Sequence, residues 1–187
     1  TLLTHIQAYL YQKKEWSPYW ENSFAPALCN RIDRNTGGIV IAAKNAEALR
    51  ILNDKIRGRE IEKSYLCVVC GRPKPAEGRL EGYLFKDTVK NQVYVTKKPQ
   101  PGAKTAVTEY RTLCSAMGLS LVECRLLTGR THQLRVHAAH PSGLNAPIAG
   151  DRLYGTAGRR LLLHAERIEF RHPATGDRIA IEKPADF

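Results

Sequence analysis

Two stretches of this sequence hold the residue types from which a reactive site could be built. In the first, residues 30–41, one aspartate lies between two arginines and is followed by the pair Gly37-Gly38. Because nearby positive charge favours the ionised form of a carboxylate, Arg31 and Arg34 should keep Asp33 charged. An ionised carboxylate held in this way can act as a nucleophile or as a base. A salt-bridged surface turn is the alternative for Asp33 taken alone.

The second stretch, residues 126–137, gathers positive charge where a strand ends and helix-like composition begins. It carries Arg130, His132 and Arg135, and no acidic residue lies between Arg125 and His137. A junction of strand and helix offers backbone N–H groups and a positive dipole end to a phosphate. We expect these three side chains to contact a polyanion, whereas His137 is expected to be a buried histidine with a partner in the core.

The rest of the sequence excludes several other chemistries. Glycoside hydrolysis normally uses two carboxylates across the scissile bond, and only Asp33 has a suggestive setting. The sequence shows no Ser-His-Asp order, no P-loop and no glycine fingerprint for a dinucleotide. One carboxylate among arginines on a basic chain therefore favours nucleophilic or base chemistry on a sugar or nucleobase of a nucleic acid.

The net charge also predicts a polyanionic partner. The 187 residues include 29 Lys and Arg against 18 Asp and Glu, which gives a formal net charge of +11. Nucleic acid is favoured over a membrane surface because no amphipathic basic helix stands out, and no apolar run approaches the roughly 18 residues of a membrane span. Residues 86–104 are rich in lysine, and Lys97 and Lys98 are expected to contact an RNA backbone. A merely solvated loop, on a basic protein without such a partner, fits the same composition.

The cysteines predict neither disulfides nor a metal site. Five cysteines is an odd number, and they sit in apolar runs, which suits a reducing cytosol. Cys67 and Cys70 are three apart in a strand pattern, so their side chains should point to opposite faces. We therefore expect the cysteines to pack in the core and expect no zinc.

The elements that must position these residues follow from hydrophobic periodicity and turn signals. A helix is expected over residues 1–13 and a second one between the N-cap Asn45 and Gly58, with an aromatic loop at 15–26 packed against the protein. Strands are expected at 39–43, 62–71, 106–113, 119–126 and 161–170, the third and fourth forming a hairpin around Met117-Gly118. Helices are too few for a doubly wound fold, so we predict one mixed α/β domain with a mostly antiparallel sheet.

Both reactive stretches resemble signatures of the RluA-type RNA pseudouridine synthases. Residues 30–38 (Asn-Arg-Ile-Asp-Arg-Asn-Thr-Gly-Gly) resemble the catalytic motif of that family, and residues 127–137 look like its second signature. Further blocks that resemble the family in the same order are residues 63–65, 147–155, 163–165 and 172–173. The family motif commonly begins with His and has Leu before the Asp, where this chain has Asn30 and Ile32.

The resemblance implies an α/β (α+β) catalytic fold with flanking helices and loops, and an isomerase that converts uridine in RNA to pseudouridine without cofactor or metal. Asp33 would be the essential carboxylate, either attacking the sugar carbon or removing a sugar proton to give a glycal. Tyr65 would stack on the flipped uracil and serve the later proton removal. Arg135 would pair with Asp33, and Arg31 would occupy the space that base flipping opens. Arg31 and Arg34 are also expected to contact the RNA.

The resemblance also sets expectations for the whole protein. Residues 1–187 should form a single catalytic domain, incomplete at its N-terminus because the family's domain usually begins with a strand bearing Lys-Pro. The expected partner is RNA, with large-subunit ribosomal RNA ahead of transfer RNA, and the expected state is a cytoplasmic monomer. Two other classes remain as alternatives: an RNA-binding module without activity, and a glycosidase that releases free uracil.

Overall fold

The structure, a computed structural model, describes residues 1–20, 23–96 and 98–187. Within these residues the elements follow in the order α1 (Leu2–Gln12), β1 (Ala27–Leu28), β2 (Gly37–Gly38), β3 (Ala42–Ala43), α2 (Ala46–Arg57), β4 (Glu62–Cys70), β5 (Glu77–Asp87), β6 (Gln92–Thr96), β7 (Lys104–Ala116), β8 (Leu119–Leu126), α3 (Gln133–Ala139), β9 (Leu163–Arg171) and β10 (Arg178–Glu182).

The chain contacts divide these elements into two compact units. The first unit contains residues 1–32, 40–61 and 169–179, and the second contains residues 33–39, 62–168 and 180–187. Each unit is described by itself below. The expectation of a single catalytic domain stays a prediction.

The first unit contains the two helices that the sequence predicts. Thr1 caps α1 through its side chain, which accepts a hydrogen bond from the Thr4 N–H. Asn45 caps α2 in the same way at 2.8 Å from the Ala48 N–H, and α2 ends at Gly58. Both helices and both caps of α2 are therefore confirmed.

The aromatic loop of this unit differs from its prediction. Tyr19 is 86% exposed and Trp20 is 53% exposed, so these rings do not pack under the loop. Trp16 and Phe24 of the same loop are half-buried, so the predicted packing is wrong only for Tyr19 and Trp20.

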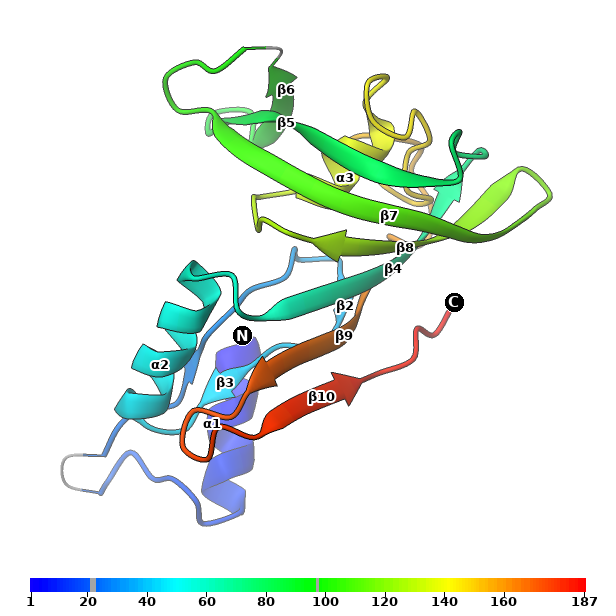
Figure 1. Ribbon diagram of the computed structural model, residues 1–187. Helices are drawn as coiled ribbons and strands as arrows, with labels where there is room; N and C mark the ends of the chain where they lie inside the picture. The colour runs from blue at the N-terminus through cyan, green and yellow to red at the C-terminus, as the bar shows by residue number, and fades with distance from the viewer. Residues whose placement is uncertain (21–22, 97) are drawn as a thin grey trace. The chain divides into compact units, whose positions relative to one another are not determined.

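The second unit is built on a long twisted sheet, shown in Figure 1. Its strands lie in the order β10-β9-β4-β8-β7-β5-β6, and β2 adds a parallel pairing to β9. The pairings of β4 with β8, β8 with β7, β7 with β5 and β5 with β6 are all antiparallel. The predicted mixed α/β architecture with a mostly antiparallel sheet is confirmed.

The hairpin between β7 and β8 also forms as predicted, with a longer first strand. Its turn residues Met117 and Gly118 have φ angles of 49° and 78°. Two successive positive φ values match the right-handed twist of the flanking strands. The hairpin brings Cys124 opposite Tyr110 and places β8 beside β4.

The predicted strand at residues 39–43 is wrong. Regular pairing is confined to the dipeptides Gly37–Gly38 and Ala42–Ala43, which pair with β9 and β1 respectively. Gly38 has a φ of 109°, which turns the backbone away from β9 after two residues. The apolar run thus changes partner instead of forming one strand.

Cysteine burial is only partly as expected. Cys67 is buried and Cys70 is exposed, which confirms that they lie on opposite faces of β4. Cys124 is buried, but Cys114 is exposed, so core packing is wrong for Cys70 and Cys114. In the described part of the chain, no three His, Cys, Asp or Glu residues gather as a metal site would require, and no helix is long and apolar enough to cross a membrane.

Candidate active site

Asp33 lies in a tight turn that is anchored to the sheet of the second unit. The Thr36 N–H donates to the Asp33 carbonyl at 2.9 Å, and the next two residues pair with His164 and Ala165 of β9. A Cβ at Gly38 would lie 2.2 Å from the carbonyl oxygen of Ala165, so only glycine permits this approach. The glycine pair therefore fixes where the Asp33 turn meets β9.

Arg135 comes from α3 and is held by a carboxylate that the sequence-based analysis did not single out. Its Nε and Nη2 donate to the two carboxylate oxygens of Asp151, each at 2.7 Å. The Asp151 side chain is fully buried, and its Oδ1 also accepts from the N–H groups of Leu153 and Tyr154. Burial raises the pKa of Asp151, but the hydrogen bonds from Arg135 and the Leu153 N–H outweigh it and hold this pKa below its ordinary value.

The third nitrogen of the same guanidinium faces Asp33. Nη1 of Arg135 lies 3.9 Å from Oδ2 of Asp33, which confirms the expected approach of the two signature residues. The expected ion pair of Arg135 with Asp33 is therefore present, but the hydrogen-bonding edge of the guanidinium is taken by a second carboxylate, that of Asp151. Asp33 therefore stands beside a positive charge without being hydrogen-bonded to it. The Asp33 side chain is 23% exposed, so it can be reached from solvent.

Tyr65, on β4, is the buried aromatic ring near this carboxylate. It is 7% exposed, and burial together with the negative charge of Asp33 raises its pKa to about 12. The phenol is consequently neutral at pH 7. Asp33 contributes because its negative charge disfavours the ionised phenol, so the two side chains interact electrostatically.

Tyr154 and His132 complete the polar surroundings of Arg135. The Tyr154 hydroxyl accepts from the Val93 N–H at 2.8 Å and lies 2.8 Å from Nδ1 of His132, while Arg135 lies over the Tyr154 ring at 5.2 Å from its centroid. Burial lowers the pKa of His132, and Arg135 acts in the same direction, whereas Asp33 opposes them. His132 is therefore neutral at pH 7, and a contact with RNA would use hydrogen bonding or stacking rather than charge.

A buried network of hydrogen bonds fixes the short helix α3. Oε1 of Gln133 accepts from the Thr128 hydroxyl at 2.8 Å and from the Arg130 N–H at 3.0 Å, and Nε2 donates to Thr108. Nδ1 of His137 lies 3.0 Å from the same Thr108 hydroxyl, which confirms a buried histidine with a partner. Burial, with a contribution from His140, lowers the pKa of His137 to about 4.

This network changes the interpretation of the junction between strand and helix. The sequence predicts a phosphate site at the N-terminus of a helix beginning at Arg130, but α3 begins only at Gln133 and has seven residues. The preceding residue, His132, has a φ of 53° and gives no side-chain cap. The Arg130 N–H is already satisfied by Gln133. The junction thus serves to fix α3, which begins three residues later than expected, and the phosphate contact there stays a prediction.

The other predicted RNA contacts lie at varied positions. Arg34 and Lys98 are exposed in the second unit, and Arg31 is exposed in the first. Nε of Arg130 donates to the Thr105 carbonyl at 2.9 Å. The prediction for Lys97 falls outside the described residues.

Asp151 and Tyr154 are the site residues that the sequence reasoning missed. A signal existed: a buried arginine requires an acidic partner, and the stretch around Arg135 contains none. Residues 147–155 already resembled a block of the family, and Asp151 is the acidic residue within it.

The fold and the site together define a class of protein. A mixed α/β sheet carries a solvent-accessible carboxylate beside an arginine and a buried tyrosine, on a basic chain suited to a polyanion. Residues 4–140 match the family described as RNA pseudouridylate synthase. The chain belongs to this family.

Curated relatives agree with that assignment. Ribosomal large subunit pseudouridine synthase C of Salmonella typhi is 35% identical over 169 residues, which cover 85% of this chain and 52% of the relative. The Dual-specificity RNA pseudouridine synthase RluA of Escherichia coli K12 is 39% identical over 168 residues, which cover 84% of this chain and 73% of that protein. The chain spans about half the length of the synthase C relatives that it matches.

Solved structures show the same fold. Human RNA Pseudouridylate Synthase Domain Containing 4 superposes with a TM-score of 0.77 at 22% identity, covering 98% of this chain and 78% of that one. Human RNA Pseudouridylate Synthase Domain Containing 1 gives a TM-score of 0.72 at 24% identity, covering 87% and 70%. At these identities the likeness bears on the fold alone.

Proposed function

We propose that this protein isomerises uridine in RNA to pseudouridine, with Asp33 as the reacting carboxylate. Large-subunit ribosomal RNA is the proposed substrate, because the relatives that match over most of this chain are named for it, and transfer RNA is the second candidate. The protein would act in the cytoplasm as a monomer, through one catalytic domain formed by residues 1–187, without a cofactor or metal.

One observation carries this proposal: the geometry around Arg135. Two of its nitrogens are fixed by Asp151 at 2.7 Å, and the third lies 3.9 Å from Asp33. A bidentate, buried pair holds a guanidinium in one orientation. Asp33 therefore has a fixed positive neighbour while its oxygens stay available to a substrate.

The proposed reaction needs the target uridine to leave the RNA stack. Flipping a base costs about a few kcal/mol, which contacts in the pocket and along the backbone offset. The bond between ribose C1′ and uracil N1 breaks, and a bond between C1′ and carbon 5 of uracil forms. The proton on carbon 5 then leaves and the freed N1 takes up a proton, so the product is an isomer of the substrate. Asp33 either attacks the sugar carbon or removes a sugar proton to give a glycal.

The remaining site residues would hold the uracil and the RNA. The neutral phenol of Tyr65 would stack on the flipped base and serve the removal of the carbon 5 proton. Arg31 would fill the space that the flipped base leaves in the RNA. Arg34, Arg130, His132, Lys97 and Lys98 are the proposed RNA contacts.

The test is Asp33→Asn, which removes the charge and basicity of the side chain at nearly constant volume. Pseudouridine formed per enzyme under single-turnover conditions should fall by on the order of 10³-fold or more. Since Asp33 is not hydrogen-bonded to Arg135, the free energy of unfolding should change by only about 0–1 kcal/mol. RNA affinity, measured in parallel, should stay within about twofold to threefold of the parent.

A matched control is Asp54→Asn, which removes the same charge from the exposed Asp54–Arg57 pair on α2. Its product formation should equal that of the parent. An Asp33→Asn protein that converts uridine at nearly the parent rate would show that another group reacts. Release of free uracil in place of pseudouridine would identify a glycosidase.

A further inference from the structure

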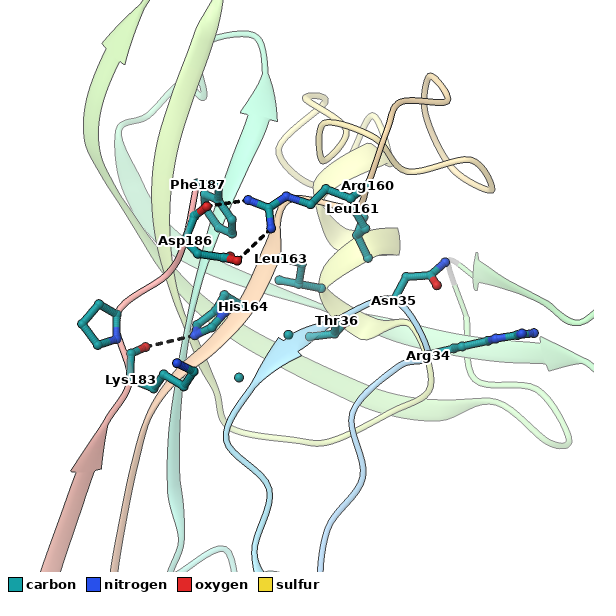
Figure 2. Close-up of a pocket in the computed structure, with 13 residues that line it drawn as sticks. Arg34, Asn35, Thr36, Arg160, Leu161, Leu163, His164, Lys183, Asp186 and Phe187 are labelled. Atoms are coloured by element: carbon teal, nitrogen blue, oxygen red, sulfur yellow. Dashed lines mark hydrogen bonds and ion pairs between the residues drawn. The ribbon is translucent and has the colours of Figure 1, made fainter. Parts of the chain in front are cut away.

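A pocket of about 380 Å³ opens in the second unit one residue beyond Asp33, and of its lining residues only Arg34 has a role above. Figure 2 shows three chain segments around it: the segment after Asp33, the beginning of β9, and the tail that follows β10. Its lining combines cationic, hydroxyl and apolar side chains. The residues that matter for its chemistry are Thr36, Arg160, Leu161, His164, Lys183 and Asp186.

The wall of the pocket between β2 and β9 is closely packed. His164 is 4% exposed, and its Nε2 lies 3.0 Å from the Lys183 carbonyl, which ties the tail to β9. A Cβ at Gly37 would lie 3.0 Å from Nδ1 of the same ring. Glycine at this position therefore leaves the space beside His164 open, and the shape of the pocket is set by packed groups.

Two cations of this pocket have weak or no acidic partners. Nη1 of Arg160 contacts Oδ2 of Asp186 at 3.0 Å, and Nη2 donates to the Asp186 carbonyl. The side chains of this pair are 48% and 75% exposed. Lys183 has no ion-pair partner within residues 1–20, 23–96 and 98–187. Arg34 also lines the pocket, but Figure 2 shows its guanidinium extending away from the tail.

Thr36 gives an independent sign that a ligand is missing. Its residue is only 9% exposed, it lines the pocket, and its hydroxyl has no hydrogen-bond partner in the described part of the chain. Buried hydroxyl groups are normally paired, because losing water without a replacement partner is unfavourable. An acceptor oxygen entering this pocket would supply a partner.

We propose that this pocket is a subsite for a phosphodiester group of the bound RNA, held by Arg160 and Lys183 after Asp186 has been displaced from Arg160. The proposal rests on the proposed function for its ligand, RNA. The Asp186 carboxylate binds Arg160 where a phosphate oxygen would bind, because a guanidinium binds carboxylates and phosphates through the same N–H donors. The pocket follows Asp33 directly along the chain, so the phosphate would belong to a nucleotide close to the target uridine.

The exposure of the resident pair is what makes displacement feasible. An ion pair between two solvent-exposed side chains stabilises the fold only slightly, so the tail carboxylate competes weakly with an RNA phosphate. Lys183 adds a second positive charge from the same tail, and the apolar Leu161 limits the solvation of a bound anion. A bound phosphate would release counterions from the RNA, and this release favours association.

The experiment measures binding without turnover. The probe is a fluorescein-labelled uridine pentanucleotide, used with phosphodiester linkages and, separately, with neutral methylphosphonate linkages. Arg160→Gln and Lys183→Gln should each lower the affinity for the charged oligonucleotide by about tenfold at low salt, and Asp186→Asn should raise it by about twofold to threefold. None of the three should change the affinity for the neutral oligonucleotide.

The matched control is Arg111→Gln. Arg111 is an exposed arginine on β7, outside the pocket, and its pair with Glu123 at 2.9 Å resembles the pair of Arg160 with Asp186. Arg111→Gln removes the same charge as Arg160→Gln but outside the pocket. Its effect on the affinity for the charged oligonucleotide therefore measures long-range attraction alone and should stay within about twofold. An equal loss in Arg111→Gln and Arg160→Gln would overturn the subsite. So would an Asp186→Asn protein that binds the charged oligonucleotide more weakly.

Inorganic phosphate distinguishes the two sources of the same chemistry. If phosphate alone saturates the pocket and Arg160→Gln abolishes that binding without affecting the oligonucleotide, the pocket serves free phosphate and the RNA subsite is wrong. The outcome is also independent of catalysis. If the protein forms no pseudouridine but the variants change RNA affinity as predicted, the subsite is retained and the proposed function is wrong. If turnover is normal but the variants do not change RNA affinity as predicted, the proposed function is retained and the subsite is wrong.

Discussion

The second unit contains two arginine–aspartate pairs with similar contacts and different surroundings. Arg135 and Asp151 are buried, with the Asp151 side chain fully enclosed, and two hydrogen bonds of 2.7 Å join them. Arg160 and Asp186 are about half and three-quarters exposed, and their closest ion-pair contact is 3.0 Å. Burial, more than contact distance, therefore decides whether such a pair holds its arginine in place or can be displaced by another anion.

Burial gives the Arg135 pair a positioning role. Removing two charges from water is unfavourable, so each depends on the other, and the guanidinium has little freedom to turn. Its third nitrogen is thereby held toward Asp33. The exposed pair has water as an alternative partner, so an RNA phosphate can replace its carboxylate.

The largest expected effect comes from breaking the buried pair with Asp151→Asn. This change removes the hydrogen-bonded counterion of the buried Arg135 and leaves only Asp33, at 3.9 Å, so the free energy of unfolding should fall by about 3–5 kcal/mol. Urea denaturation at pH 7 measures it. Pseudouridine formation by the remaining folded protein should also fall, because Arg135 is no longer held toward Asp33.

A double variant sharpens this test. Arg135→Met combined with Asp151→Asn removes both charges of the buried pair, so the free energy of unfolding of the double variant should exceed that of Asp151→Asn alone. The activity of the double variant should stay low, since the positive neighbour of Asp33 is gone. A single variant as stable as the parent would contradict the idea that the pair is buried and mutually dependent.

A second expected effect concerns a buried titratable group on the same helix, His137. Its pKa is about 4 in the folded protein against 6.5 for an ordinary histidine, because burial disfavours the charged ring. The stabilising contribution of the neutral ring is therefore complete above pH 6.5 and is lost as the pH falls toward 4. Over this window the free energy of unfolding should decrease by about 3 kcal/mol from this residue.

The measurement compares urea midpoints at pH 7.5 and pH 4.5 for the parent and for His137→Gln. Glutamine can still form a hydrogen bond with Thr108 but does not titrate, so the urea midpoints at the two pH values should differ less in His137→Gln than in the parent. His5→Gln, at an exposed position of α1, serves as the control for removing a histidine. An unchanged difference in His137→Gln would show that other groups cause the loss of stability in acid.

The smallest expected effect comes from Asp186→Asn, the same substitution made in the exposed pair. The free energy of unfolding should change by about 0–1 kcal/mol, compared with the several kcal/mol expected for Asp151→Asn. The two variants, measured side by side in urea at pH 7, test the comparison directly. A loss of more than about 2 kcal/mol in Asp186→Asn would mean that the tail is an integral part of the fold.

Much of the local structure was determined by the sequence alone. Asn45 and Gly58 mark the ends of α2, and the alternation around Tyr65 predicts β4, because caps and side-chain periodicity depend on neighbouring residues. Asp33, the carboxylate proposed to react, was also recognisable, since its arginines and glycines are adjacent to it. Residues 39–43 show the limit of such reasoning: an apolar β-branched run predicts extended backbone, but the strand it pairs with is decided elsewhere.

The partners of charged side chains were decided only by the tertiary structure. Nothing near Arg135 in the chain indicates that Asp151, rather than Asp33, takes its hydrogen-bonding edge, and nothing near Arg160 indicates Asp186. These pairings depend on where α3, β9 and the tail lie after the sheet has formed. Local patterns reflect interactions over a few residues, whereas an ion pair and the burial that gives it its strength require distant segments to meet.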